Sequence, residues 1–341
     1  MKIGIILCGQ AIEPGGGVRM QGLMWRDGLK LLGHEVDLVN FWETYEWKAY
    51  DAIIVLQMVG QFGSILELIS MNNPNVYFAP ILDPGPNATI KRYRFLAKTM
   101  NSVRNNRIGR VLHISSDFMD FYEYKKYAKG FLTRSKQETE YVSKCFDIPL
   151  GKISMVPLSL RFSPLEEMPG DKEDFCLHVS RLASPNKNVE RLVQAAKKFS
   201  FNLKLAGYLH GDAEKQWMKS LIGDANNIEY VGSLRDDELK EYYRRAKVFA
   251  LPSYVEGVGM VAMEAASYGC EVVLTNMGAP KDYYHGMAEL VDPFSVDEIG
   301  IAVLKCLKEG KSQPKLMKFI KDEYSLASCS RKLQAAISNC L

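Results

Sequence analysis

The chain has 341 residues, of which 47% are hydrophobic and 24% charged, and its formal net charge is +3. These values are ordinary for a soluble globular protein, and the length suits two domains of usual size. No apolar run approaches the roughly 18 residues of a membrane span, and no signal peptide is expected, because a strand-like segment begins at residue 2. The seven cysteines are widely spaced without a Cys-x-x-Cys pair, which favours reduced thiols over disulfides or zinc ligands.

Strand-like and helix-like segments alternate from the first residue, which predicts parallel sheets with helices on both faces. In the first half, a helix is expected at 18–32 and strands at 2–8, 35–39, 52–56, 76–81, 110–114 and 130–133. From 153 to 170 the periodicity is lost and three prolines occur, which is typical of a connection between domains. Alternation resumes with strands at 175–179, 202–205, 228–231, 248–251 and 271–274, and a terminal helix follows at 326–337.

This organisation predicts an α/β protein with two doubly wound Rossmann-like domains. We assign residues 1–160 to an N-terminal domain and 161–323 to a C-terminal domain. The terminal helix, 324–341, is expected to pack back toward the N-terminal domain. Because ligands of such sheets bind outside the carboxyl ends of the strands, the two domains are expected to face an interdomain cleft that holds the site.

The most informative pattern lies between 256 and 264. The apolar run 247–251 reads as a buried parallel strand, and a turn containing Gly257 and Gly259 leads from it into a helix. The glycines leave main chain exposed to a ligand, and the first N–H groups of the helix can receive an anion. Glu256 and Glu264 would flank that anion as acceptors for hydroxyl groups. The pattern therefore indicates a ligand that carries both phosphate and several hydroxyls.

Two other groups stand at predicted strand ends. Arg181 and Lys187 lie six residues apart across a strand-to-helix turn, and two such cations can hold both phosphates of a diphosphate. Three glycines at 15–17 follow the first strand and would let the backbone approach a phosphate. Surface cations and turn glycines are common by themselves, so this interpretation depends on their combination with the 256–264 pattern.

Residues 256–265 read Glu-Gly-Val-Gly-Met-Val-Ala-Met-Glu-Ala and resemble the Glu-x7-Glu motif of retaining nucleotide-sugar glycosyltransferases of family 4. That family usually carries an aromatic residue at the position of Val258. The resemblance extends closely from 175 to about 307 and is looser over the first 150 residues. It implies the GT-B fold, in which 1–160 would bind the acceptor and 161–323 the nucleotide sugar. It also implies retaining transfer of a sugar from a nucleoside-diphosphate-sugar donor, a UDP- or GDP-sugar, to a saccharide or lipid-linked saccharide acceptor.

The resemblance also assigns roles to individual residues. Glu256 would bind hydroxyls of the transferred sugar and Glu264 those of the ribose, while Arg181 and Lys187 would stabilise the leaving diphosphate; Glu256, Arg181 and Lys187 are the expected catalytic residues. Further substrate contacts are expected from Gly16, Gly17, Leu234, Gly257, Gly259, Met260, Val261 and Asp83. Asp83 stands where many relatives carry a His-Asp pair, here without the histidine, and His113 is expected to be structural. Because no Asp-x-Asp pair is present, neither a metal nor another cofactor is expected.

Three alternatives remain. A nicotinamide-dependent oxidoreductase would use the first strand, its glycines and Asp37, although Gly9 is followed by Gln10 and Ala11 instead of the dinucleotide-binding pattern. A sugar-nucleotide epimerase would have the same fold but need its own acid and base. A non-catalytic sugar-nucleotide-binding protein would keep the nucleotide contacts and lose Glu256 or Lys187, both of which are present.

The charge is unevenly distributed. Residues 91–136 contain twelve basic and three acidic side chains, a local charge of +9, with aromatic residues between them. A solvated helix face is one interpretation, and a surface for anionic lipid head groups is the other. No nucleic-acid-binding motif accompanies the stretch. The expected location is cytoplasmic, with peripheral contact at the inner membrane face, in bacterial surface polysaccharide or glycoconjugate synthesis.

Overall fold

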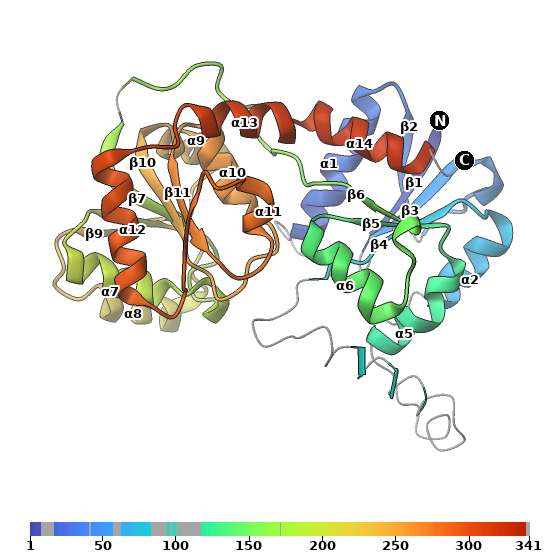
Figure 1. Ribbon diagram of the computed structural model, residues 1–341, viewed down its shortest axis with the longest axis horizontal. Helices are drawn as coiled ribbons and strands as arrows, with labels where there is room; N and C mark the ends of the chain where they lie inside the picture. Colours follow the sequence, from blue (N-terminus) through green and yellow to red (C-terminus); the bar gives the residue numbers. More distant parts are fainter. Residues whose placement is uncertain are drawn as a thin grey trace. The chain divides into compact units, whose positions relative to one another are not determined.

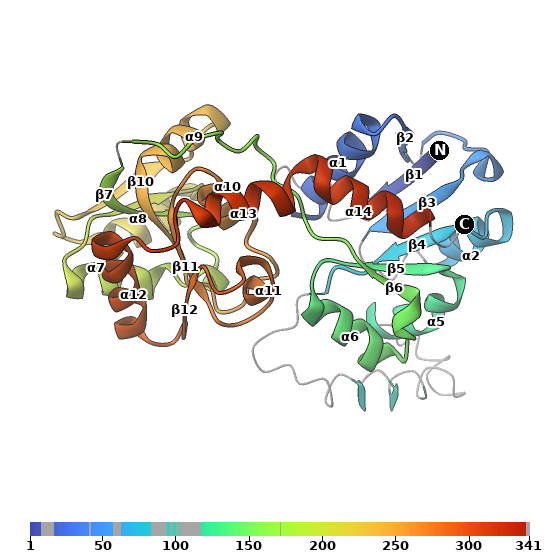
Figure 2. The ribbon, with the colours of Figure 1, turned by 45° about the horizontal axis from the view of Figure 1, so that its top comes forward.

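The computed structural model describes residues 1–7, 17–40, 42–56, 63–82, 94–95, 98–99, 102, 117–170 and 172–338. These form two compact units, shown in Figure 1 and, turned by 45°, in Figure 2. The N-terminal unit comprises the described residues between 1 and 82, between 94 and 159 and between 326 and 338, and the C-terminal unit comprises those between 160 and 325. The chain therefore returns to its first unit for the last helix. Each unit is built around its own parallel sheet.

The N-terminal sheet has six parallel strands in the order β2-β1-β3-β4-β5-β6. Its central strands are apolar and buried along their whole length, as expected where helices cover both faces. The strands are β1 (Lys2–Leu7), β2 (Glu35–Leu38), β3 (Ala52–Leu56), β4 (Val76–Ala79), β5 (Gly130–Thr133) and β6 (Ile153–Met155).

Successive side chains of these strands enter two separate cores. One core lies under α1 and α14, and the other under α2, α5 and α6. Helices α1 and α14 run close together because Gly28 of α1 has no side chain; a Cβ there would lie 1.8 Å from the Ser330 hydroxyl oxygen. The helices are α1 (Gly17–Leu31), α2 (Gly63–Asn72), α5 (Asp117–Tyr124), α6 (Lys136–Phe146) and α14 (Leu326–Ser338).

The C-terminal sheet also has six parallel strands, in the order β12-β11-β10-β7-β8-β9. Numbered within the unit, this is the Rossmann order 3-2-1-4-5-6 read from the other edge, and the order reverses between β7 and β10. Ligands of such sheets bind at the carboxyl ends of the strands beside this reversal. The strands are β7 (Glu173–Val179), β8 (Leu203–Ala206), β9 (Ile228–Gly232), β10 (Ala246–Leu251), β11 (Glu271–Thr275) and β12 (Glu289–Val291).

Helices cover both faces of this sheet as well (Figure 1). The apolar sides of α7, α8 and α12 pack into one core with β7, β8 and β10, and α10 packs between the sheet and α9 and α13 on the other face. The helices are α7 (Val189–Phe199), α8 (Gly211–Ile222), α9 (Asp236–Arg245), α10 (Met260–Ser267), α11 (Pro280–Tyr284), α12 (Val296–Glu309) and α13 (Lys315–Tyr324).

The predicted fold class, two Rossmann-like α/β units, is confirmed, and the predicted strands that the structure describes agree to within two residues at each end. The strand predicted at 110–114 lies outside the described residues. The interpretation of 153–170 as a connection was wrong at its start, because Ile153–Met155 forms β6 on the sheet edge. This strand has only three residues, two of them partly exposed and Met155 exposed, which is too few to give an apolar run. No helix among the described residues is long and apolar enough to cross a membrane. The five described cysteines are buried thiols.

Candidate functional site

Asn186 joins the loops that follow β7 and β10, the two strands at the reversal. Its carbonyl accepts a hydrogen bond from the Tyr254 amide at 2.8 Å, and its side chain exchanges two bonds with the backbone of Val255, at 2.8 and 3.1 Å. Asn188, two residues after Asn186, is buried, and its side chain donates to the carbonyl oxygens of Pro252 and Pro293 at 2.9 and 2.7 Å. The two loops are thus fixed to each other by one main-chain hydrogen bond and three bonds between asparagine side chains and main chain.

This joint brings two of the predicted catalytic side chains together. Lys187 Nζ lies 2.9 Å from Glu256 Oε2, although the residues are 69 positions apart in the chain. The Lys187 side chain is 24% exposed and that of Glu256 13%. The ion pair is therefore sheltered but reachable from solvent. Such a pair is bound more firmly than a fully exposed one because water screens it less.

Gly278 holds the main chain of Glu256 from the other side. The Ala279 amide donates to the Glu256 carbonyl at 3.2 Å, and the Glu256 amide donates to the Met277 carbonyl at 3.4 Å. A Cβ on Gly278 would lie 2.0 Å from the Glu256 carbonyl oxygen, and its φ of +98° favours glycine. Gly278 is not among the residues predicted from the sequence, where its only signal is a glycine in the loop after a predicted strand.

The glycine turn leads into α10 as expected. Gly259 has φ +73° and stands before the first residue of the helix, where it offers no side chain to cap the amides. Its carbonyl accepts bonds from Ala262 and Met263. The amides of Met260 and Val261 precede these bonds and are the donors that a helix start leaves for a ligand. Both residues are partly exposed, as is Gly257.

Glu264, one turn further along α10, lies in a different environment from Glu256. It is only 2% exposed, and its carboxylate accepts bonds from Arg161 Nε at 3.0 Å and from the Tyr243 hydroxyl at 3.1 Å. Burial raises the pKa of the Glu264 carboxyl above its ordinary value, and the bonds from Arg161 and Tyr243 offset only part of that rise. Arg161 was also missed, since it lies in the proline-containing stretch interpreted as a connection.

A buried histidine supports the turn that carries Arg181. His178 Nδ1 donates to the Ala250 carbonyl at 2.8 Å, so in the neutral ring Nε2 accepts from the Ser180 hydroxyl at 2.7 Å. Burial lowers the pKa of His178 to about 4, with the Lys187 charge acting in the same direction, and the ring is neutral at pH 7. Arg181 follows directly and is exposed.

Leu234 and Gly17 are the other predicted contact residues that the structure describes. Leu234 is partly buried in the loop between β9 and α9. Gly17 is the exposed first residue of α1 in the N-terminal unit, where a Cβ would meet nothing within 4 Å. Gly16, Asp83 and His113 lie outside the described residues. The roles given to these residues stay predictions.

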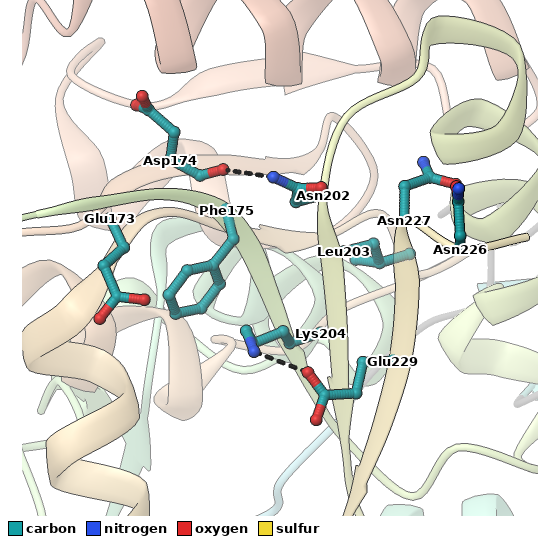
Figure 3. Close-up of a pocket in the computed structure, with 9 residues that line it drawn as sticks. All are labelled: Glu173, Asp174, Phe175, Asn202, Leu203, Lys204, Asn226, Asn227 and Glu229. Atoms are coloured by element: carbon teal, nitrogen blue, oxygen red, sulfur yellow. Dashed lines mark hydrogen bonds and ion pairs between the residues drawn. The ribbon is translucent and has the colours of Figure 1, made fainter.

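A pocket of about 320 Å³ lies at the amino-terminal ends of strands in the C-terminal sheet, away from their carboxyl ends (Figure 3). It is formed where β7, β8 and β9 begin, and Figure 3 shows its Lys204 paired with Glu229 at 2.6 Å. None of the predicted site residues lines it. Because ligands of parallel sheets bind at the carboxyl ends of the strands, we place the candidate site on the joined loops instead. Within the described part of the chain, no three His, Cys, Asp or Glu side chains are grouped to hold a metal.

Replacing Gly278 by alanine is expected to release the main chain of Glu256, because the added Cβ overlaps the Glu256 carbonyl oxygen. Hydrogen–deuterium exchange of peptides covering 254–258 and 276–280 should accelerate at least about tenfold, which corresponds to the loss of about 1.4 kcal/mol of protection. Gly286→Ala is the matched control, since Gly286 has φ +78° but open space around its Cβ position. Equal protection of the 254–258 peptide in both variants would contradict this account.

Residues 166–323 match the family model for glycosyl transferases group 1. The O-antigen chain mannosyltransferase B of Escherichia coli is 26% identical over 200 residues, which cover 53% of this chain and 52% of that protein. The chain spans about half the length of the curated relatives it matches. Among solved structures, sucrose-phosphate synthase from Thermosynechococcus elongatus aligns with a TM-score of 0.71 and 17% identity, over 99% of this chain and 98% of that one.

An Anabaena protein solved in complex with UDP and glucose aligns with a TM-score of 0.67 and 14% identity, over 99% of this chain and all of that one. At these identities the structural matches establish the fold. The family match favours glycosyl transfer over the nicotinamide alternative. The chain therefore has the GT-B fold, and most of its C-terminal unit matches the group 1 glycosyltransferases.

Proposed function

We propose that this protein is a retaining glycosyltransferase that moves a sugar from a nucleoside-diphosphate-sugar to a saccharide or lipid-linked saccharide. The observation that carries the proposal is the contact between Lys187 and Glu256 at the strand-order reversal of the unit that matches the group 1 glycosyltransferases. One loop supplies a cation for phosphate and the other a carboxylate for hydroxyls. A nucleotide sugar needs both within reach of each other.

The donor diphosphate would lie against the start of α10. The amides of Met260 and Val261 supply hydrogen bonds and the positive end of the helix dipole, while Lys187 and Arg181 supply full charges. Glu256 would accept hydroxyls of the transferred sugar, and Glu264 those of the ribose, with Leu234 beside the base. We further propose that Gly16, Gly17 and Asp83, from the first quarter of the chain, also contact the substrate.

In the proposed reaction, the bond between C1 of the sugar and the oxygen of the β-phosphate breaks, and C1 forms a bond to the acceptor oxygen on the same face. The proton of the acceptor hydroxyl passes to the leaving phosphate oxygen, so no side-chain base is needed. Negative charge accumulates on the leaving diphosphate, where Lys187 and Arg181 stabilise it. Preorganised contacts of this kind are worth roughly 3 kcal/mol each in typical sites. We propose that these cations replace a metal ion.

The names of similar proteins support this substrate class. The Escherichia coli relative is an O-antigen chain mannosyltransferase, and the Anabaena structure contains UDP and glucose. UDP- and GDP-sugars are accordingly the first donors to test, and surface polysaccharide or glycoconjugate synthesis is the proposed context. A cytoplasmic enzyme would meet lipid-linked acceptors at the inner membrane face.

Peripheral membrane contact is proposed through the basic stretch 91–136. In its described part, several charges are already neutralised: Arg94 and Lys98 both bind Asp147, at 2.9 and 3.2 Å, and Arg134 is buried against Glu138. The local charge of +9 therefore overstates the charge available to a membrane. The exposed Lys126 and Phe95, which is 68% exposed, are the described side chains best suited to a lipid surface.

The donor class is tested by a thermal-shift and turnover panel of UDP-, GDP- and ADP-sugars, each with and without excess EDTA. The cognate nucleotide should raise the melting temperature because it binds the native state alone, and at a hundred times its Kd it adds about 2.7 kcal/mol of stability. Transfer to acceptor saccharides with retained configuration, undiminished by EDTA, is expected. An epimerised donor sugar formed without acceptor would instead identify the epimerase alternative.

Lys187→Ala and Glu256→Ala should each lower kcat by about 10²–10³-fold while leaving the protein folded, since both remove contacts to the reacting groups. The control is Lys305→Ala, which breaks an exposed ion pair with Glu289 in the same unit and should leave turnover unchanged. The measurement is kcat with the cognate donor, beside circular dichroism of each variant. Undiminished turnover in either site variant would contradict the assignment.

Membrane contact is tested by sedimentation with vesicles of phosphatidylglycerol and of phosphatidylcholine. Binding to the anionic vesicles is expected at low salt and should weaken several-fold between about 50 and 300 mM NaCl, because salt screens exposed charges. Phosphatidylcholine vesicles are the control and should bind little. If the protein fails to sediment with anionic vesicles at low salt, the membrane proposal is withdrawn.

A further inference from the structure

Glu264 is a nearly fully buried carboxylate, and its surroundings are mostly uncharged. Among the described residues, the titratable groups that interact electrostatically with it are Arg161, Tyr243, Asp236 at the start of α9, Tyr268 and Tyr284. Burial raises the pKa of all three tyrosines, so they are neutral at pH 7, and the Asp236 charge opposes ionisation of Glu264. Among these groups, Arg161 is the sole cation. The charge of Glu264 therefore depends on a residue outside the motif.

Arg161 is held in place by three independent contacts. Its Nε lies 3.0 Å from Glu264 Oε1 and its Nη1 lies 2.8 Å from Asp236 Oδ1. Its guanidinium carbon lies 4.0 Å from the ring centroid of the buried Phe162, a cation–π contact. The preceding residue, Leu160, donates its amide to the Tyr324 carbonyl at 2.8 Å. The side chain has little freedom to leave Glu264.

The hydrogen bonds to Glu264 leave one part of the carboxylate open. An ionised carboxylate has about four acceptor positions, two on each oxygen. The Tyr243 hydroxyl and Arg161 Nη2, at 3.1 and 3.5 Å, contact Oε2, whereas Oε1 receives only Arg161 Nε among these donors. Arg161 itself is 27% exposed, so the pair borders solvent. Oε1 thus keeps capacity for one hydroxyl donor from a ligand.

We propose that Arg161 is a positioning residue that keeps Glu264 ionised and turns Oε1 toward a ribose hydroxyl of the bound donor. The inference deepens the proposed function and rests on it. Without the guanidinium, a buried carboxyl beside Asp236 takes up a proton near neutral pH and becomes a hydrogen-bond donor on one oxygen. It then accepts a ribose hydroxyl less well. Donor affinity should consequently become sensitive to pH when Arg161 is removed.

The experiment measures calorimetric Kd values for UDP and GDP between pH 5.5 and 8 with wild type, Arg161→Gln, Arg161→Lys and Glu264→Gln. For the nucleotide that binds wild type, we expect Arg161→Gln to lose about tenfold more affinity than wild type between pH 8 and pH 6, a comparison in which titration of the nucleotide's terminal phosphate cancels. Arg161→Lys keeps the charge and should lie between the two. Glu264→Gln cannot titrate and should bind weakly at every pH. At pH 8, kcat at saturating donor should change little in Arg161→Gln, while KM rises at low pH.

Arg245→Gln is the matched control, because it removes another two-point arginine–carboxylate contact. Its partner, Glu173, lies at the start of β7, at the end of the sheet away from the candidate site. It should keep the wild-type pH profile. A pH-independent loss in Arg161→Gln, or wild-type affinity throughout, overturns the inference alone. Wild type that binds neither nucleotide and transfers no sugar overturns the proposed function and the inference with it. Arg161→Lys provides the same test of charge if the glutamine variant does not fold.

Discussion

The candidate site depends on the hydrogen bonds by which Asn186 connects the loops after β7 and β10. Parallel strands bring their carboxyl ends to one edge of the sheet, but loops beyond that edge are free to diverge unless something binds them to each other. Asn186 satisfies backbone groups of Tyr254 and Val255 directly, so Lys187 and Glu256 are carried to within 2.9 Å by a rigid connection. A side-chain attraction alone would be weaker, because both residues border water.

The two glutamates of the motif have been given different surroundings by the same short segment. Glu256 stands on the loop, restrained at its main chain by Gly278 and paired with Lys187, the cation that we propose binds the donor phosphate. Glu264 lies inside α10 and is buried, where an unpaired charge would be costly. The cost is offset by Arg161 and Tyr243. Glu256, on the loop, is therefore the carboxylate nearer to solvent, whereas Glu264, in the helix, is buried and held by its partners.

Sequence patterns predicted most of the described strands because buried parallel strands are short apolar runs, several of which end at glycine or proline. They missed β6, whose three residues carry no such run, and they interpreted the segment containing Arg161 as a simple connection. Its prolines do interrupt regular structure. Periodicity, however, indicates only which side of a helix or strand is buried. It does not predict that Arg161 contacts Glu264 on a helix more than a hundred positions away.

The sequence by itself determined the α/β class, the two-unit organisation and the residue types of the candidate site, because each is written in local patterns of apolar runs, glycines and charges. Tertiary structure alone decided the strand order with its reversal between β7 and β10, the partner of each carboxylate, and the place of Gly278 and Arg161 beside them. These depend on contacts between segments far apart in the chain, whose burial and geometry leave no local signature.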